Sequence, residues 1–317
     1  MKNEKLDIDL VYLWVDGNDP KWLEKRNAFI GGSVKENTSA DCKGRYADND
    51  ELKYSLRSIE KYAPWIRKIF IVTDNQTPDW LDAENSKIKI IDHKDIIPQE
   101  SLPCFNSALI EHFLYKIPEL SECFLYANDD MFINKAVSPD MFFTANGFPI
   151  IRLNRKPLRR FRWFCRQRIF KNPLKHNSNA ILNATELVKQ KYGIYYSGLP
   201  HHNIDAYLKS DCQRVAEQTF KNEIEAVLIN QKRSYNDIQR IIFSYVALAE
   251  KRGHLRYASR KDSLHVQIHK ENDYKKFEKY NPTFFCMNDS QYAQDSDRMK
   301  AKAFLSKLFP EKSAFEK

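Results

Sequence analysis

Short apolar runs alternate with helical patterns over the first 150 residues of this chain, and no other feature constrains its fold as strongly. Four runs are rich in β-branched and aromatic residues and are typical of buried strands: 9–15, 69–72, 87–91 and 123–127. Apolar residues recur at helical intervals from Leu52 to Ala63, just before Pro64, and again from Ser107 to Ile117. This alternation predicts an α/β protein whose mostly parallel sheet carries helices on its faces.

The second half of the chain is less regular and more helical in its patterning. A helix is expected from Asp237 to Arg252, where apolar residues again follow the helical period. Asp48 and Glu51 have the spacing of a capping box, which predicts how the helix around Leu52 begins.

Hydropathy, the N-terminal sequence and the cysteines indicate in which cellular compartment the protein is found. The mean hydropathy is −0.63, and no apolar run approaches the ~20 residues that a membrane helix needs. The chain opens without the pattern of a signal peptide, so we expect a cytoplasmic protein. Its six cysteines, Cys42 among them, are scattered without close pairs, which disfavours a disulfide framework and a structural zinc site.

Positive charge is concentrated in one segment. Ten Lys or Arg and no acidic residue lie between Arg152 and Lys175, and without them the net charge of +9 becomes −1. Phe161, Phe164 and other aromatic residues alternate with these cations near helical spacing. The pattern favours a basic amphipathic helix on an anionic membrane surface. Contact with diphosphate groups, nucleic acid binding and a solvated basic loop are the alternatives.

Asn128, Asp129 and Asp130 directly follow a predicted buried strand. Because ligands of open α/β sheets bind at the carboxyl ends of strands, the loops beginning at Asp16, Thr73 and Asn128 should share one functional edge. Carboxylates at such a strand end can hold Mg²⁺ on substrate phosphates. A polar turn with an Asx motif is the alternative.

Two further positions could carry chemistry. Glu111 lies near the start of the predicted helix from Ser107, where it could orient a substrate hydroxyl or support a metal, or simply face solvent. His201 and His202 are adjacent, and an imidazole titrates near neutrality, so either could remove a proton from a sugar hydroxyl. An ordinary structural role is the alternative for this pair.

Longer stretches are more specific than these single residues. The segment DIDLVYLWVDGNDPKW, the long run from Arg45 to Gly147, the pair His201-His202 followed by RSYNDI, and FFCMND followed by LFPEKSAFE occur in this order. Together they resemble the four conserved blocks of the Stealth family of polysaccharide phosphotransferases. The third block departs from the family pattern. In the family a proline usually lies between two histidine-like positions, whereas here Pro200 precedes the adjacent pair His201-His202.

The resemblance implies a glycosyltransferase-A-like sheet, a UDP-sugar donor, Mg²⁺ or Mn²⁺, and a polysaccharide or lipid-linked oligosaccharide as acceptor. It implies three segments: a nucleotide-sugar-binding core over 1–150, a basic aromatic insert over 151–178, and a part over 179–317 that completes the active site. It also implies roles for individual residues. Those expected in catalysis are His202 or His201, Arg233, Glu111 and Asp130. Those expected at the donor are Asp16, Gly17, Asn128, Asn288 and Asp289, with Asp129 and Asp130 as metal ligands.

The expected reaction moves a sugar 1-phosphate onto a hydroxyl of a growing bacterial surface polysaccharide and releases UMP. We expect this to happen at the inner face of the plasma membrane, with the insert touching the membrane and with no nucleic acid partner. A conventional metal-dependent glycosyltransferase that releases UDP is the first alternative. A basic module that binds membrane or nucleic acid is the second.

Overall fold

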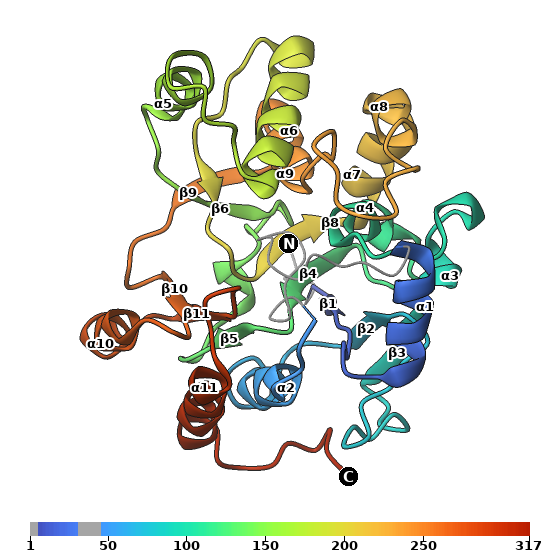
Figure 1. The fold of residues 1–317 in the computed structure, drawn as a ribbon, viewed down its shortest axis with the longest axis vertical. Helices are drawn as coiled ribbons and strands as arrows, with labels where there is room; N and C mark the ends of the chain where they lie inside the picture. Colours follow the sequence, from blue (N-terminus) through green and yellow to red (C-terminus); the bar gives the residue numbers. More distant parts are fainter. Residues whose placement is uncertain (1–5, 31–45) are drawn as a thin grey trace.

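The computed structural model describes residues 6–30 and 46–317. Its central sheet has the order β3-β2-β1-β4-β8 (Figure 1). The strands are β1 (Ile8–Leu13), β2 (Ile69–Thr73), β3 (Ile88–Asp92), β4 (Cys123–Asn128) and β8 (Asp205–Leu208). Neighbouring strands run parallel except for β8, which is antiparallel to β4. The predicted α/β class with a mostly parallel sheet is therefore confirmed.

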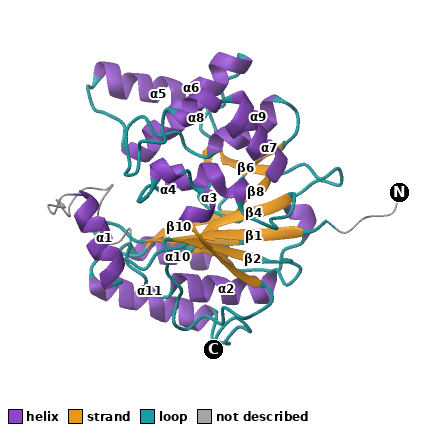
Figure 2. Cartoon of the chain, turned by 90° about the vertical axis from the view of Figure 1, so that its right-hand side faces the viewer, coloured by secondary structure: helices purple, strands orange, loops and turns teal. Residues whose placement is uncertain are grey.

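The central strands are apolar along their length because both faces of the sheet are covered. Side chains alternate between the faces along each strand. Val11 and Phe124 pack into one core with helices from the second half of the chain. Leu10 and Leu125 pack into the other core, which includes Leu52 and its neighbours on the following helix. Figure 2 shows the resulting layers, with helices above and below the strands.

The helices over the two faces come from different parts of the chain. Helix α2 (Glu51–Tyr62) covers one face, and α4 (Ser107–Ile110), α6 (His176–Tyr192), α7 (Lys209–Arg214) and α9 (Ile241–Ala249) cover the other. The remaining helices are α1 (Pro20–Ile30), α3 (His93–Ile96), α5 (Arg159–Phe164), α8 (Lys221–Glu225), α10 (Glu271–Tyr280) and α11 (Asp295–Leu308).

Two smaller sheets join segments that are far apart in the sequence. One has the order β10-β11-β5, formed by β10 (Ser263–Gln267), β11 (Phe284–Asn288) and β5 (Met131–Ile133). The other has the order β7-β6-β9, formed by β7 (Leu199–Pro200), β6 (Ile150–Asn154) and β9 (His254–Tyr257). The central sheet and the β10-β11-β5 sheet thus pair strands from the two sides of residue 150, and the division into three segments stays a prediction.

The predicted strands agree with the structure to within about two residues, but three helical predictions change. The helix expected over 107–117 is α4 followed by a 3-10 turn over Glu111–Lys116. The helix expected from Asp237 begins at Ile241. The capping box of Asp48 and Glu51 is wrong, because Asp50 is the N-cap and Glu51 bonds back to the backbone N–H of Asn49.

The basic segment is only partly a surface helix. Arg152 lies in β6 with its side chain buried, because its guanidinium lies over the rings of Phe142 and Phe284. The helical part is α5 and a π-helical turn over Cys165–Ile169. Over the described residues, no helix has the length and apolarity that crossing a bilayer requires. The cysteines at 104, 123, 165, 212 and 286 carry free thiols, and Cys42 lies outside the described residues.

Candidate active site

A pocket opens at the carboxyl ends of the parallel strands, where the sequence predicted a functional edge. Leu13 and Trp14 reach it from the end of β1, Val72 from β2, and Asn128 from the end of β4. Parallel strands bring these ends to one edge, and the loops that follow are free to diverge around a ligand. The pocket is therefore a consequence of the sheet order.

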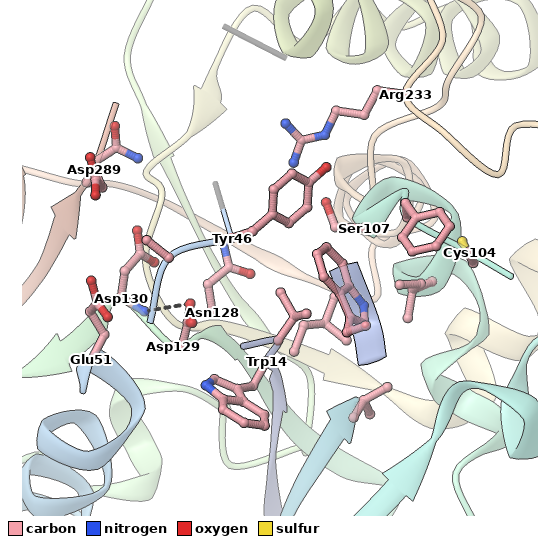
Figure 3. A pocket seen from close by; sticks show the side chains of 18 of the residues that line it. Trp14, Tyr46, Glu51, Cys104, Ser107, Asn128, Asp129, Asp130, Arg233 and Asp289 are labelled. Carbon is pink, nitrogen blue, oxygen red and sulfur yellow. Dashed lines mark hydrogen bonds between the residues drawn. The ribbon is translucent and has the colours of Figure 1, made fainter. Parts of the chain in front are cut away.

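Three carboxylates gather on one side of this pocket, Glu51, Asp129 and Asp130, and we call this side the acidic end (Figure 3). Burial, followed by the charges of Asp130 and Glu51, raises the pKa of Asp129 well above its usual range. Burial also raises the pKa of Glu51 to about 7 and that of neighbouring Asp48 to about 6. Burial, together with repulsion between neighbouring carboxylates, thus favours the protonated forms at the acidic end.

Asp130 is held where the central sheet meets the small β10-β11-β5 sheet. Its backbone N–H donates to the Asp129 carboxylate at 3.1 Å. Its carbonyl accepts from the N–H of Met287 at 2.9 Å, and its carboxylate accepts from the thiol of Cys286 at 3.0 Å. Both partners lie on β11. A strand from the end of the chain therefore fixes a carboxylate that follows β4.

The donor set at the acidic end fits a hard divalent cation. Mg²⁺ prefers carboxylate oxygens and keeps room for substrate phosphates and water. Crowded carboxylates with raised pKa values are stabilised when such a cation binds. The residues that would hold it are Asp129 and Asp130, with Glu51 beside them.

The other side of the pocket is aromatic. Trp22 contacts Tyr46 with ring centroids 5.2 Å apart and contacts Phe105 edge-on at 5.6 Å. We call this side, formed by Trp22, Tyr46 and Phe105, the aromatic end. Cys104 and Ser107 line the pocket beside it. An aromatic wall beside a charged centre suits a ligand that combines a base with phosphate groups.

Asp16 and Gly17, predicted at the donor, lie next to the pocket without lining it. The backbone N–H of Gly17 donates to the carbonyl of Tyr46 at 2.6 Å. A Cβ on Gly17 would lie 2.3 Å from that carbonyl oxygen, so only glycine permits this approach. The N–H of Asp16 bonds to Gln76 at 3.0 Å. Gly17 thus holds the backbone of Tyr46 in place at the aromatic end.

Arg233 and His202 line the pocket, as the sequence predicted, whereas His201 does not. Figure 3 shows the Arg233 guanidinium extending over Tyr46. His202 has a left-handed backbone with φ 57°, and burial lowers the pKa of its imidazole to about 3. His201 is fully buried and bonds to Asp205 at 3.1 Å and to Ser263 at 3.2 Å.

Glu111 belongs to a buried network behind the pocket, so the alternative of a solvated helix face is wrong. Its carboxylate accepts from Tyr126 at 2.9 Å and from Arg240 at 3.2 Å. The Tyr126 hydroxyl also lies 2.7 Å from the side-chain oxygen of Asn128, and Arg240 also donates to Asp205 at 3.0 Å. Glu111 can therefore act on the pocket by orienting the Asn128 side chain.

Asn288 and Asp289, which the sequence predicted at the donor, line the pocket at the end of β11. The carboxylate of Asp289 accepts two hydrogen bonds from Arg298 on α11, at 2.7 and 3.2 Å. This bidentate pair fixes the carboxylate orientation.

Several lining residues were not singled out from the sequence, notably Glu51, Tyr46, Trp22 and Phe105. Glu51 was taken as a helix cap because a carboxylate in the first turn of a helix usually has that role. The aromatic residues lie in segments whose partners are distant in sequence, and the adjacency of Trp22 to the predicted β1 loop was the one available signal.

Comparisons with known proteins identify conserved regions in this chain. The model of Stealth protein conserved region 1 matches residues 6–34, and that of conserved region 2 matches residues 45–151. These ranges contain β1 to β4, Asp129 and Asp130.

The curated relatives of this chain are named as polysaccharide phosphotransferases. A capsular polysaccharide phosphotransferase of Actinobacillus pleuropneumoniae is 39% identical over 245 residues, which is 74% of this chain and 63% of that protein. One of Haemophilus influenzae is 38% identical over 246 residues, or 77% and 65%. An exopolysaccharide phosphotransferase of Streptomyces coelicolor is 32% identical over 327 aligned positions, or 98% and 33%. The chain thus spans less than two thirds of the length of these relatives.

Among solved structures, the galactosyltransferase LgtC superposes with a TM-score of 0.47 at 13% identity, covering 96% of each chain. At this TM-score the likeness carries no conclusion about the reaction. The two conserved regions and the curated relatives decide the family instead: the chain belongs to the Stealth family.

Proposed function

We propose that this protein transfers a sugar 1-phosphate from a UDP-sugar to a hydroxyl of a growing surface polysaccharide and releases UMP. The observation that carries the proposal is the pocket itself, in which an acidic end, an arginine and an aromatic end surround one space. The names of the curated relatives support the same reaction class.

The donor would span the pocket. Its base would stack at the aromatic end, where Trp22, Tyr46 and Phe105 line the pocket. Its diphosphate would lie between Arg233 and the carboxylates, with the forked guanidinium donating to phosphoryl oxygens. A Mg²⁺ or Mn²⁺ ion held by Asp129 and Asp130 would neutralise charge on the diphosphate.

The bond changes follow from this placement. The acceptor oxygen forms a bond to the phosphorus that carries the sugar, and the bond from that phosphorus to the bridging oxygen of UMP breaks. The sugar keeps its anomeric C–O bond, so its configuration is retained. Catalysis then depends mainly on positioning and on neutralising charge, which the chain supplies through Arg233 and the fixed pocket walls.

His202 is the proposed base, because it faces the pocket while His201 is held by Asp205 and Ser263. Its pKa of about 3 leaves the imidazole neutral, with a lone pair that can accept the hydroxyl proton. The negative charge of a bound diphosphate would raise this pKa and so strengthen the base. His202→Gln should abolish turnover at unchanged stability, whereas His201→Gln should lower the melting temperature.

The nucleotide product tests the reaction class. Purified protein with UDP-glucose or UDP-N-acetylglucosamine and an oligosaccharide acceptor should release UMP and give a phosphodiester signal in phosphorus NMR. Release of UDP would overturn the proposal in favour of a conventional glycosyltransferase on the same fold.

We also propose that α5 docks on the inner face of an anionic membrane, where a lipid-linked acceptor would grow. Five of the thirteen exposed large hydrophobic residues in the described part of the chain lie in α5 or directly beside it: Leu158, Phe161, Phe164, Ile169 and Phe170. The inner side of α5 is anchored, because Arg159 is buried, donates to Thr185 at 3.0 Å and stacks on Trp163. Figures 1 and 2 place α5 at the periphery, where its outer side is accessible.

Apolar side chains among exposed cations match the requirements of an anionic bilayer surface. The double substitution Phe161→Asp and Phe164→Asp should reduce sedimentation with phosphatidylglycerol vesicles at least tenfold. Ile229→Asp is the matched control, since Ile229 is 80% exposed on another segment. Equal losses in the two variants, or vesicle binding that is insensitive to salt, would contradict docking through α5.

A further inference from the structure

Three metal-ligating side chains converge beside the acidic end from segments far apart in the sequence. The ligand atoms of His202, His265 and Cys286 all lie within 4.8 Å of one another, and we call this group the soft-metal cluster. His265 on β10 and Cys286 on β11 are register partners in neighbouring parallel strands, so their side chains share one face of the sheet. His202 approaches that face from the turn between β7 and β8.

The surrounding structure fixes two members of the cluster. His202 has φ 57°, a left-handed conformation that a non-glycine residue keeps only where the surroundings impose it. Its ring meets the ring of His265 edge-on, with centroids 5.3 Å apart. Cys286 is fully buried, and its thiol donates to the Asp130 carboxylate at 3.0 Å. A fourth potential ligand therefore touches the cluster already.

We propose that the soft-metal cluster, with Asp130 as a fourth ligand, binds a borderline or soft divalent cation of the Zn²⁺ class. Imidazole nitrogen and thiolate sulfur are the ligands that Zn²⁺ selects, and Mg²⁺ disfavours them. In a tetrahedral site the ligand atoms lie roughly 3.3–3.8 Å apart, so a contraction of about 1 Å completes the geometry. His265 can supply this movement because its side chain is exposed. On binding, the thiol proton of Cys286 passes to solvent.

This inference goes beyond the proposed function and does not depend on it. The hard cation of the phosphotransfer would lie on Asp129 and Asp130, whereas the proposed site lies on Asp130 and the soft-metal cluster. Because the two sites share Asp130, and because a metal on His202 occupies the lone pair of the proposed base, Zn²⁺ should inhibit turnover even with Mg²⁺ in excess.

Cobalt is the probe for the site, because Co²⁺ replaces Zn²⁺ in sites of this chemistry and absorbs light when a thiolate binds it. Titrating the reduced full chain with Co²⁺ should produce a thiolate-to-cobalt charge-transfer band that saturates near one equivalent and is abolished by Zn²⁺. Cys286→Ser should lose this band. Cys104→Ser is the matched control, since Cys104 lies at the aromatic end of the same pocket, and it should keep the band.

His265→Ala guards against misfolding of the cysteine variant, because an exposed histidine can be removed with little effect on stability. It should weaken Co²⁺ and Zn²⁺ binding at least tenfold and raise the inhibitory Zn²⁺ concentration by the same factor, since even outer-shell changes have effects of about 10–100-fold. Absence of the band in the wild type, its persistence in Cys286→Ser, or its loss in Cys104→Ser would overturn the proposal. The cobalt band and the Co²⁺ and Zn²⁺ affinities do not require phosphotransfer, so a failure of these readouts is distinct from a failure of the proposed reaction.

Discussion

Gly17→Ala should weaken donor binding through a residue that does not itself line the pocket. A Cβ at this position would lie 2.3 Å from the carbonyl oxygen and 2.4 Å from the Cβ of Tyr46. An ordinary contact needs about 3.4 Å, so the Tyr46 segment must move by roughly 1 Å. The 2.6 Å hydrogen bond from Gly17 N–H to the Tyr46 carbonyl is strained by the same movement.

The magnitude follows from what Tyr46 is proposed to do. Stacking of a base on an aromatic ring contributes about 1–3 kcal/mol, so loss of the Tyr46 ring should weaken binding of the donor nucleotide about 5- to 150-fold. The carboxylates at the acidic end do not move, and turnover at saturating donor should change less than twofold to threefold. Crowding of this kind lowers stability by about 1–3 kcal/mol, which corresponds to a melting temperature lower by about 2–4 °C in a chain of 317 residues.

Calorimetric titration with UDP, together with donor KM, measures the effect. Tyr46→Ala should lose a similar affinity, and the double variant Gly17→Ala/Tyr46→Ala should lose no more than Tyr46→Ala alone. Gly198→Ala controls for crowding. Its Cβ would lie 2.8 Å from the Leu153 side chain, and neither residue lines the pocket. Unchanged UDP affinity in Gly17→Ala, or additive losses in the double variant, would refute the reasoning.

Three further substitutions separate chemistry from stability. Asp130→Asn should reduce turnover at least about 100-fold and leave the melting temperature equal or higher by about 1–2 °C, because it removes one of several crowded charges; a large drop in melting temperature would instead make Asp130 a structural residue. Arg240→Met should lower the unfolding free energy in urea by about 3–5 kcal/mol, since it leaves the carboxylates of Glu111 and Asp205 buried and unpaired, and adding Glu111→Gln should recover part of the loss. Burial lowers the pKa of His112 to about 4, so between pH 6.5 and 4 the unfolded chain takes up a proton that the folded chain does not. The free energy of unfolding should therefore decrease as the pH is lowered through this range, by up to about 1.4 kcal/mol per pH unit. His112→Gln should show a smaller pH dependence of urea unfolding, and an identical dependence in both proteins would contradict the assignment.

The parts of the fold that were predictable depend on local sequence. The strand at Ile69–Thr73 is buried on both faces, so its residues form a continuous run of β-branched and aromatic side chains that is visible without any partner. Asp129 and Asp130 were found for the same reason, because a strand end and its carboxylates are adjacent in the chain. Turn chemistry and apolar period therefore sufficed for the four parallel strands of the central sheet and for two of the three carboxylates at the acidic end.

The remaining features depend on pairs that no local pattern records. Strand β5 has only three residues, and its pairing with β11 brings together positions more than 150 residues apart. Glu111 looked like a surface residue because its partner Arg240 lies 129 positions further along the chain. The soft-metal cluster escaped notice because spacing reveals a metal site only when its ligands are close in sequence.

The pairing of β5 with β11 explains why the end of the chain matters to a site that the central sheet begins. Without β11, the Asp130 carboxylate would lose the thiol of Cys286, and its backbone would lose the bond to Met287. The same strand delivers Asn288 to the pocket. Because the carboxyl ends of β4 and β11 meet at this carboxylate, the pocket forms only when both sheets have assembled. Loss of pocket function should therefore accompany any change that separates β11 from β5, even where the central sheet stays folded.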